Sequence, residues 1–259
     1  CRGVSVVPTT QDLSGASVSL VNEKDRAMKL RNALMPAKEF YDYIFIDCPP
    51  TLDMLTINAL AAADSVLIPL QCEFLSLEGL VELHNTINRV KVSFNPDLDI
   101  EGILFTMCVE RYKITGQIIS EVKKHFAKEV FETTIPRNVA LSEAPSFGEP
   151  AIYYDKKAKG SKAYENLAKE IAKGGNLDLG AFLPLWGLNF FRQEDFERSV
   201  ANDGRQFPAL AEDAIQRACK ATVKSKKRRI CSVFFLFWKI LLINIRIIFG
   251  LFIIRPNSY

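Results

Sequence analysis

Histidine is scarce in this chain of 259 residues, which contains only His84 and His125. None of the six cysteines belongs to a C-x-x-C pair, and none has the spacing of a zinc-ligand set. A structural metal site is therefore not expected, and reduced thiols in a cytoplasmic protein are the better interpretation. The first residues also lack the basic and apolar regions of a secretory signal, so no such signal is expected.

Charge is divided unevenly along the chain. Residues 1–173 carry 20 Lys and Arg against 23 Asp and Glu, whereas residues 174–259 carry 13 against 7. The shorter second part also holds ten of the 18 Phe residues. These differences predict a folded domain over residues 1–173 and a tail of unknown role over residues 174–259.

Short β-type runs alternate with helical patterns in residues 1–173. We expect strands at 4–7, 43–47, 66–69 and 100–106, and helices at 23–34, 57–63, 116–126 and 163–172, with a further helix capped by Ser76. This alternation predicts an α/β fold in which helices cover both faces of a parallel sheet. Ligands of such sheets bind beyond the carboxyl ends of the strands, so we expect the functional residues just after Val7, Asp47, Ile68 and Phe105.

Asp47 is the sharpest chemical feature, because it ends the apolar run Tyr-Ile-Phe-Ile and is followed by Pro49 and Pro50. A carboxylate at a strand tip can hold a hydrated Mg²⁺ ion on a nucleotide. The simpler interpretation, in which Asp47 only caps the following turn, stays open from this pattern alone.

Longer motifs are more specific. DYIFIDCPP (42–50), TINALAAAD (56–64) and VLIPLQ (66–71) resemble the ParA/Soj chromosome-partitioning ATPases, which are deviant Walker P-loop ATPases related to MinD. Segments that agree in order and spacing follow at 73–79, 102–107, 135–139, 142–146 and 160–164. The similarity covers about residues 4–173, and residues 135–146 favour the partition branch over MinD.

The resemblance implies ATP and Mg²⁺ as cofactors, an ATP-dependent homodimer, DNA binding without sequence preference, and hydrolysis stimulated by a ParB-like partner. Carried over by position, Asp47 is the Walker B-like carboxylate that holds Mg²⁺ through water. Thr106, Met107, Pro136 and Arg137 are expected beside the adenine. The resemblance also implies a cytoplasmic, nucleoid-associated protein acting in chromosome or plasmid segregation.

One departure from the family concerns the phosphate-binding residues. This sequence contains no K-G-G-x-G-K-T/S loop and no following strand that ends in D-x-D-P-Q. We therefore expect an amino-terminally truncated ATPase that is inactive alone, with a non-hydrolysing scaffold for a partition partner as the alternative. In the family both missing strands lie inside the sheet, so the strands at 4–7 and 43–47 are expected to separate and leave unpaired edges.

The basic residues Lys156, Lys157, Lys159 and Lys162 form a cluster in the sequence. They are candidates for contacts with DNA phosphates, which depend on salt and not on sequence. A solvated loop before the last helix is the alternative. Ala140 is a second departure, because partition ATPases commonly have a basic residue there that is thought to face DNA, and this weakens the DNA-binding inference.

The tail contains a hydrophobic segment at residues 233–254, in which 18 of 22 residues are large and apolar. Its length suffices to span a bilayer, but Lys239 and Arg246 offset much of the apolar insertion energy. Three interpretations of this segment stay open. It is a MinD-like membrane tether, an extension that binds a partner, or a stretch of sequence that has not been selected to form a structure. We expect residues 174–259 to be dispensable for the ATPase fold.

Overall fold

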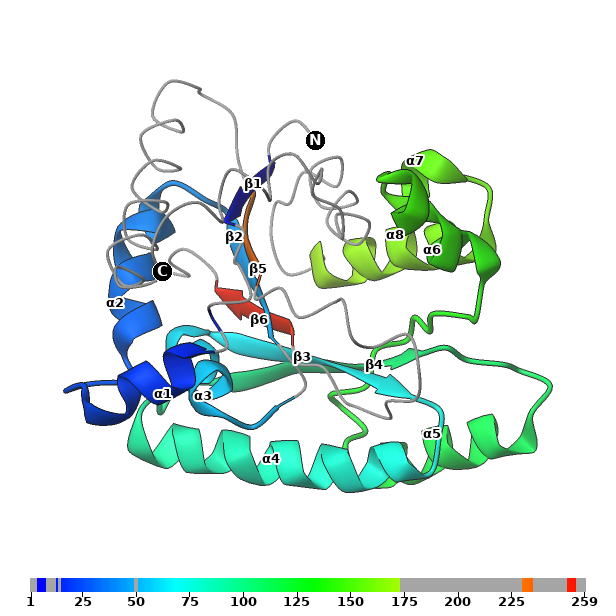
Figure 1. The fold of residues 1–259 in the computed structure, drawn as a ribbon. Helices are drawn as coiled ribbons and strands as arrows, with labels where there is room; N and C mark the ends of the chain where they lie inside the picture. Colours follow the sequence, from blue (N-terminus) through cyan, green and yellow to red (C-terminus); the bar gives the residue numbers. More distant parts are fainter. Residues whose placement is uncertain are drawn as a thin grey trace.

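The computed structural model describes residues 4–7, 13, 15–48, 51–172, 230–234 and 251–254. Within this part of the chain, six strands form one sheet in the order β1-β5-β2-β6-β3-β4 (Figure 1). The strands are β1 (Val4–Val7), β2 (Tyr43–Asp47), β3 (Ser65–Gln71), β4 (Asp99–Thr106), β5 (Ile230–Phe234) and β6 (Leu251–Ile254). The four strands that the sequence predicts in residues 1–173 are therefore confirmed, with slightly different ends.

The sheet is parallel except at one strand. β5 runs parallel to both β1 and β2, and β3 runs parallel to β4. β6 is antiparallel to both of its neighbours, β2 and β3, so β2 and β3 point in the same direction. The carboxyl ends of β1, β2, β3 and β4 consequently lie at one edge of the sheet, where the fold class places ligands.

The tail contributes two interior strands. β5 lies between β1 and β2, so the expected separation of the strands at 4–7 and 43–47 is confirmed. The unpaired edges that we expected beside them are not found, because β5 and β6 form ladders with β1, β2 and β3. Most of residues 174–259 lie outside the described residues, and the boundary near Lys173 stays a prediction.

The described helices agree with the sequence pattern in type and order. They are α1 (Ala16–Ser19), α2 (Lys29–Leu34), α3 (Met54–Ala62), α4 (Leu75–Ser93), α5 (Lys113–His125), α6 (Val139–Glu143), α7 (Ala151–Tyr154) and α8 (Lys159–Ala172), with 3₁₀ turns η2 (Leu20–Asn22), η3 (Met35–Glu39) and η4 (Ala144–Phe147). α3, α5 and α8 begin three or four residues before the predicted starts, and two further predictions of a helix start are wrong. α2 begins only at Lys29, because Asp25 has a left-handed backbone with φ of 55°. Ser76 does not cap α4, because the helix begins at Leu75 and Ser76 is buried in its first turn.

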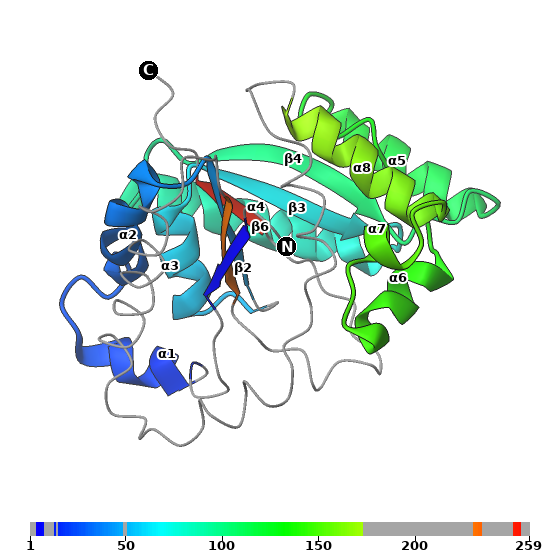
Figure 2. The same cartoon turned by 90° about the horizontal axis from the view of Figure 1, so that it is seen from above.

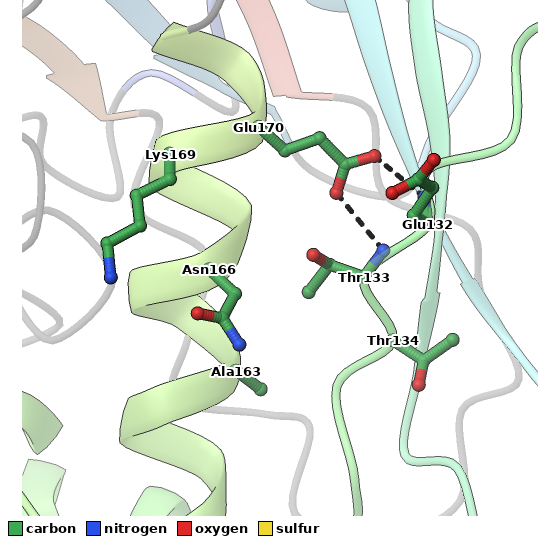
Figure 3. A pocket seen from close by; sticks show the side chains of 7 residues that line it. All are labelled: Glu132, Thr133, Thr134, Ala163, Asn166, Lys169 and Glu170. Atoms are coloured by element: carbon green, nitrogen blue, oxygen red, sulfur yellow. Dashed lines mark hydrogen bonds between the residues drawn. The ribbon is translucent and has the colours of Figure 1, made fainter.

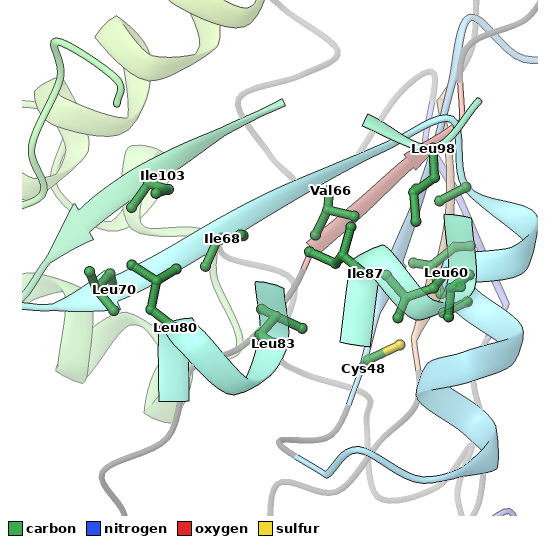
Figure 4. Packing of buried hydrophobic residues seen from close by; sticks show 14 of the residues in the cluster. Cys48, Leu60, Val66, Ile68, Leu70, Leu80, Leu83, Ile87, Leu98 and Ile103 are labelled. Carbon is green, nitrogen blue, oxygen red and sulfur yellow. The ribbon is translucent and has the colours of Figure 1, made fainter. Parts of the chain in front are cut away.

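Helices cover both faces of the sheet, as the sequence predicts. Along β2, Ile44 and Ile46 point to one face while Tyr43 and Phe45 point to the other, since successive side chains alternate. The first face packs against α2, α3, α4 and α5 through the core residues in Figure 4, which include Leu60, Leu83 and Ile87. The second face packs against α8 through Leu167, Ala168 and Ile171. Figures 1 and 2 show α4 and α8 on opposite sides of the sheet.

No helix among the described residues is long and apolar enough to cross a membrane. The two ends of the hydrophobic segment 233–254 belong to β5 and β6, and its middle lies outside the described part of the chain. The three interpretations of this segment stay predictions.

Candidate functional site

Polar residues end three of the strands at the carboxyl edge of the sheet. Asp47 is the last residue of β2, Gln71 ends β3, and Thr106 ends β4, with Gln71 directly opposite Thr106 in the ladder. β2 and β4 are three strand spacings of about 4.8 Å apart, and the ladders place Asp47 level with Gly102, four residues before Thr106. Asp47 and Thr106 therefore lie roughly 20 Å apart. The edge therefore offers two separate positions for a ligand.

Asp47 is a half-buried carboxylate at the first of these positions. Burial raises its pKa from 3.8 to about 7, because a charge is poorly stabilised away from water. The helix that follows, α3, is capped by another residue: the carboxylate of Asp53 accepts hydrogen bonds from the N–H groups of Leu55 at 3.0 Å and Thr56 at 3.3 Å. Asp53, and not Asp47, therefore caps α3, while the turn at residues 49–50 lies outside the described residues and the turn-capping interpretation of Asp47 stays open. A bound cation would stabilise the ionised form of Asp47.

The neighbouring Cys48 belongs to the hydrophobic core. Figure 4 shows its side chain among the packed apolar residues, and only 3% of it is exposed. Burial and the charges of Asp47 and Asp53 raise the pKa of this thiol well above its usual value. Cys48 is therefore a packed small residue and a poor thiolate.

The second position joins two segments that lie far apart in the sequence. Ile135 donates its N–H to the carbonyl oxygen of Phe105 at 2.8 Å, and Cys108 donates to Ile135 at 3.0 Å. Arg137 in turn donates to the carbonyl oxygen of Cys108 at 3.1 Å. We call residues 105–108 and 135–137 together the strand junction. It brings together all four residues that the sequence predicts beside the adenine: Thr106, Met107, Pro136 and Arg137.

The strand junction has an unusual backbone and an exposed surface. Met107 has a left-handed φ of 54°, which turns the chain at the end of β4, and its side chain is 46% exposed. Arg137 is also exposed, while Thr106 and Pro136 are half-buried. The surface therefore presents an apolar side chain beside a cation, which suits an aromatic base.

Asn138 adds a feature that sequence reasoning missed. Its side-chain oxygen is buried and has no hydrogen-bond partner within the described part of the chain. A buried acceptor without a partner costs free energy, so it fits a ligand that donates an N–H group, as adenine does. The only available signal was its position directly after Pro136 and Arg137 in the motif.

Glu170 holds the segment that leads into the strand junction. In Figure 3 its carboxylate accepts hydrogen bonds from the N–H groups of Glu132 at 2.7 Å and Thr133 at 3.1 Å, across a pocket between α8 and this segment. The pocket is lined by Glu132, Thr133, Thr134, Ala163, Asn166, Lys169 and Glu170. Sequence reasoning did not find Glu170, because its partners are backbone groups about forty residues away.

The predicted DNA-binding lysines lie between the end of α7 and the first turns of α8. Figure 2 shows α6, α7 and α8 next to one another. Lys156 and Lys157 occupy the turn before α8, Lys159 begins that helix, and Lys162 lies in its first turns; all four are exposed. Asp155 fixes the turn by accepting hydrogen bonds from the N–H groups of Lys157 at 2.9 Å and Ala158 at 3.1 Å.

Ala140 lies close to these lysines. It belongs to α6, which packs against α8 so tightly that a Cβ atom on Gly160 would lie 2.5 Å from Leu141. The basic residues and the position where the family commonly has another basic residue therefore share one surface region.

A single carboxylate is the only metal-binding group that the sequence predicts at the carboxyl edge. No group of three or more His, Cys, Asp or Glu side chains gathers anywhere in the described residues. Mg²⁺ commonly keeps several waters and uses one or two carboxylates together with substrate phosphates. Asp47 thus fits a hydrated Mg²⁺ ion on a nucleotide.

A mostly parallel sheet covered on both faces, with polar residues at its carboxyl edge, is an architecture that many nucleotide-binding proteins share, the P-loop proteins among them. In agreement, the structure of cobyrinic acid a,c-diamide synthase from Mycobacterium smegmatis is similar, with a TM-score of 0.51 and 33% identity over 61% of this chain and 57% of that one. A family model described as an AAA domain matches residues 1–100.

Two curated relatives define the family more closely. The chromosome partitioning protein ParA of Myxococcus xanthus is 57% identical over 172 residues, which cover 66% of this chain and 61% of that protein. The sporulation initiation inhibitor protein Soj of Bacillus subtilis is 52% identical over 174 residues, which cover 67% of this chain and 69% of that protein. The chain belongs to the ParA/Soj family of chromosome-partitioning ATPases. It spans about three fifths of the Myxococcus xanthus relative.

Proposed function

We propose that this chain carries the Mg²⁺-binding and adenine-binding parts of an ATPase that segregates chromosomal or plasmid DNA. The observation that carries the proposal is the strand junction, where hydrogen bonds unite the two segments expected beside the adenine. The junction lies at the same sheet edge as Asp47, beyond the carboxyl ends of the strands, where this fold class binds its ligands. Membership of the ParA/Soj family supports the same function.

Each residue has a distinct role in this proposal. Asp47 holds a water on Mg²⁺, and the cation offsets the cost of keeping a half-buried carboxylate ionised. Thr106, Met107, Pro136 and Arg137 form the surface under the adenine, while the oxygen of Asn138 accepts a hydrogen bond from its amino group. ATP supplies the phosphoryl group that is transferred to water.

The wider activity follows the family. The protein forms an ATP-dependent homodimer and binds DNA without sequence preference. A ParB-like partner stimulates its hydrolysis of ATP. The protein acts in the cytoplasm, where it associates with the nucleoid. Exposure of Lys156, Lys157, Lys159 and Lys162 on one surface region supports the DNA-binding part, because phosphate contacts need accessible cations.

A second candidate function is a non-hydrolysing scaffold that binds a partition partner. This candidate concerns the 259 residues alone, which contain no phosphate-loop motif. Backbone N–H groups and a Lys of that loop normally surround the β- and γ-phosphates, and no other segment of this sequence has the same motif.

Nucleotide binding tests the proposal. The probe is fluorescent ATP titrated, with and without Mg²⁺, into a chimera that carries the amino-terminal segment of the Bacillus subtilis relative, which supplies the family's phosphate loop. We expect Mg²⁺-dependent binding of ATP in preference to GTP. Asn138→Leu should weaken ATP binding by about tenfold, since an adenine amino group loses its acceptor. A chimera that folds but binds neither nucleotide would contradict the proposal and favour the scaffold.

A further inference from the structure

Two thiols meet at the carboxyl edge of the sheet. The Sγ atoms of Cys72 and Cys108 lie 3.2 Å apart, and the structure describes both residues as free cysteines. Cys72 directly follows β3, and Cys108 lies two residues beyond the end of β4. Gln71 and Thr106 are opposite each other in the parallel ladder, and the left-handed turn at Met107 brings Cys108 beside Cys72.

We propose that Cys72 and Cys108 form a redox modification site, in which a peroxide-class oxidant converts the two thiols into an intramolecular disulfide. The sulfur atoms need to approach by little more than 1 Å to reach the bond length of about 2.05 Å. Both residues lie just beyond the ends of adjacent paired strands, which are about 4.8 Å apart and hold the two backbones near each other. The geometry therefore requires no strand rearrangement.

The two thiols differ in chemistry. Either sulfur can donate the hydrogen bond that joins the two thiols. With Cys72 as the donor, this bond lowers the pKa of the Cys108 thiol, while the same bond together with burial raises the pKa of Cys72. Cys108 is consequently the better nucleophile, and Cys72 is the thiol that resolves the intermediate. Both side chains retain slight exposure, at 7% for Cys108 and 8% for Cys72, so a molecule of the size of hydrogen peroxide can approach the pair.

The reaction balances in two steps. The Cys108 thiolate attacks one oxygen of the peroxide, the O–O bond breaks, and the leaving hydroxide takes up a proton to become water, which leaves Cys108 as a sulfenic acid. The sulfur of Cys72 then attacks Sγ of Cys108, the S–O bond breaks, and the departing hydroxide accepts the Cys72 proton. Two thiols lose two electrons, and one peroxide becomes two waters. A cellular dithiol or glutathione reverses the change by thiol–disulfide exchange.

The site does not depend on the proposed function, because the chemistry needs only the two thiols and the oxidant. Disulfides in cytoplasmic proteins are usually transient and act in catalysis or redox sensing. The backbone of Cys108 also carries the hydrogen bonds to Ile135 and Arg137, so the disulfide would attach the end of β3 to the strand junction.

Peptide mapping of the folded 259-residue chain tests this inference. The protein is exposed to hydrogen peroxide, free thiols are alkylated, and the digest is analysed by mass spectrometry. We expect a Cys72 peptide linked to a Cys108 peptide, lighter by two hydrogen atoms and separated again by dithiothreitol. The proposal would be overturned if both residues were still alkylated after a dose of peroxide that oxidises other thiols of the chain. It would also be overturned if either residue formed a disulfide with a different cysteine.

Three variants separate the roles of the thiols. Cys72→Ser should trap Cys108 as a sulfenic acid and increase its labelling by a dimedone probe severalfold, whereas Cys108→Ser should leave Cys72 unlabelled. Cys48→Ser is the matched control, because Cys48 is buried and its pKa is raised, and it should leave the linked peptide unchanged. If Cys72→Ser does not fold, the linked peptide in the unmodified chain still decides, and its absence contradicts the proposal.

Discussion

The backbone N–H of Arg137 donates to the carbonyl oxygen of Cys108 across 3.1 Å, and this bond completes the strand junction. Neither segment of the junction is a site by itself, because Met107 lies on one and Pro136 and Arg137 lie on the other. The surface beside the expected adenine therefore depends on tertiary hydrogen bonds. Any change that loosens the segment before Ile135 should also disturb this surface.

Glu170 provides a direct way to loosen that segment. Glu170→Ala removes the acceptor for the N–H groups of Glu132 and Thr133, so we expect the free energy of unfolding to fall by about 1–2 kcal/mol. Urea denaturation measures the loss, and faster hydrogen exchange at Thr133 locates it. Glu165→Ala is the control, since its exposed ion pair with Lys169 should contribute less than about 0.5 kcal/mol. Equal losses in both variants would show that Glu170 does not hold the segment.

Asp47 should make stability depend on pH when Mg²⁺ is absent. Its folded pKa of about 7 lies above the unfolded value of 3.8, so the folded state binds the extra proton between these values and loses stability as pH rises through this range. Asp47→Asn should therefore be more stable than the unmodified chain at pH 8, by at most about 4 kcal/mol, since each pKa unit is worth about 1.4 kcal/mol. The difference should vanish below about pH 4. Thermal unfolding in EDTA across this range measures it, and a constant difference at every pH would contradict the assignment.

The lysines before and within α8 should control the salt dependence of DNA binding. In the chimera with ATP, replacing Lys156, Lys157, Lys159 and Lys162 by Ala should reduce the slope of log affinity against log salt by up to about 3–4, because each phosphate contact contributes about 0.9. Fluorescence anisotropy with DNA duplexes of two unrelated sequences measures this slope. Replacing the exposed Lys123, Lys124 and Lys128 of α5 and the turn after it provides the control. An unchanged slope in the fourfold variant would exclude this surface region.

Removal of residues 174–259 should have different effects in the 259-residue chain and in the chimera. In the 259-residue chain, ending at Lys173 removes β5 and β6 and exposes the edges of β1, β2 and β3, so aggregation should increase. In the chimera, the restored amino-terminal strands should occupy the interior of the sheet, and the same truncation should leave the Tm unchanged. Light scattering and thermal unfolding measure these effects, with a chain that ends at Ile254 as the control. A chimera that melts several degrees lower after truncation would place the tail inside the domain.

The sequence predicted the layers of the fold and the edge of the sheet that carries the candidate site. Continuous apolar runs such as 43–47 identify buried strands, and the carboxyl-terminal position of Asp47 follows directly from such a run. The positions of β5 and β6 were not predictable, since parallel and antiparallel neighbours depend on contacts between residues far apart in the chain. Glu170 and Asn138 escaped notice for a similar reason: burial and backbone partners give them their importance, and neither leaves a pattern in the sequence.

The start of α2 shows a further limit of the sequence pattern. Helical spacing from residue 23 predicts one continuous helix, but the backbone of Asp25 adopts a left-handed conformation that interrupts it. Asp tolerates this conformation better than most residues, so its presence permits the turn without requiring it.

Phosphate release with Mg²⁺ and DNA tests the central claim most directly. The 259-residue polypeptide should show no release above background, because it has no phosphate loop, whereas the chimera should hydrolyse ATP. Asp47→Ala should abolish the activity of the chimera, and Asp99→Asn should retain it, because Asp99 lies at the amino end of β4, on the opposite edge of the sheet. Full activity of the Asp47→Ala chimera, or hydrolysis by the 259-residue polypeptide that is lost on the same substitution, would contradict this account.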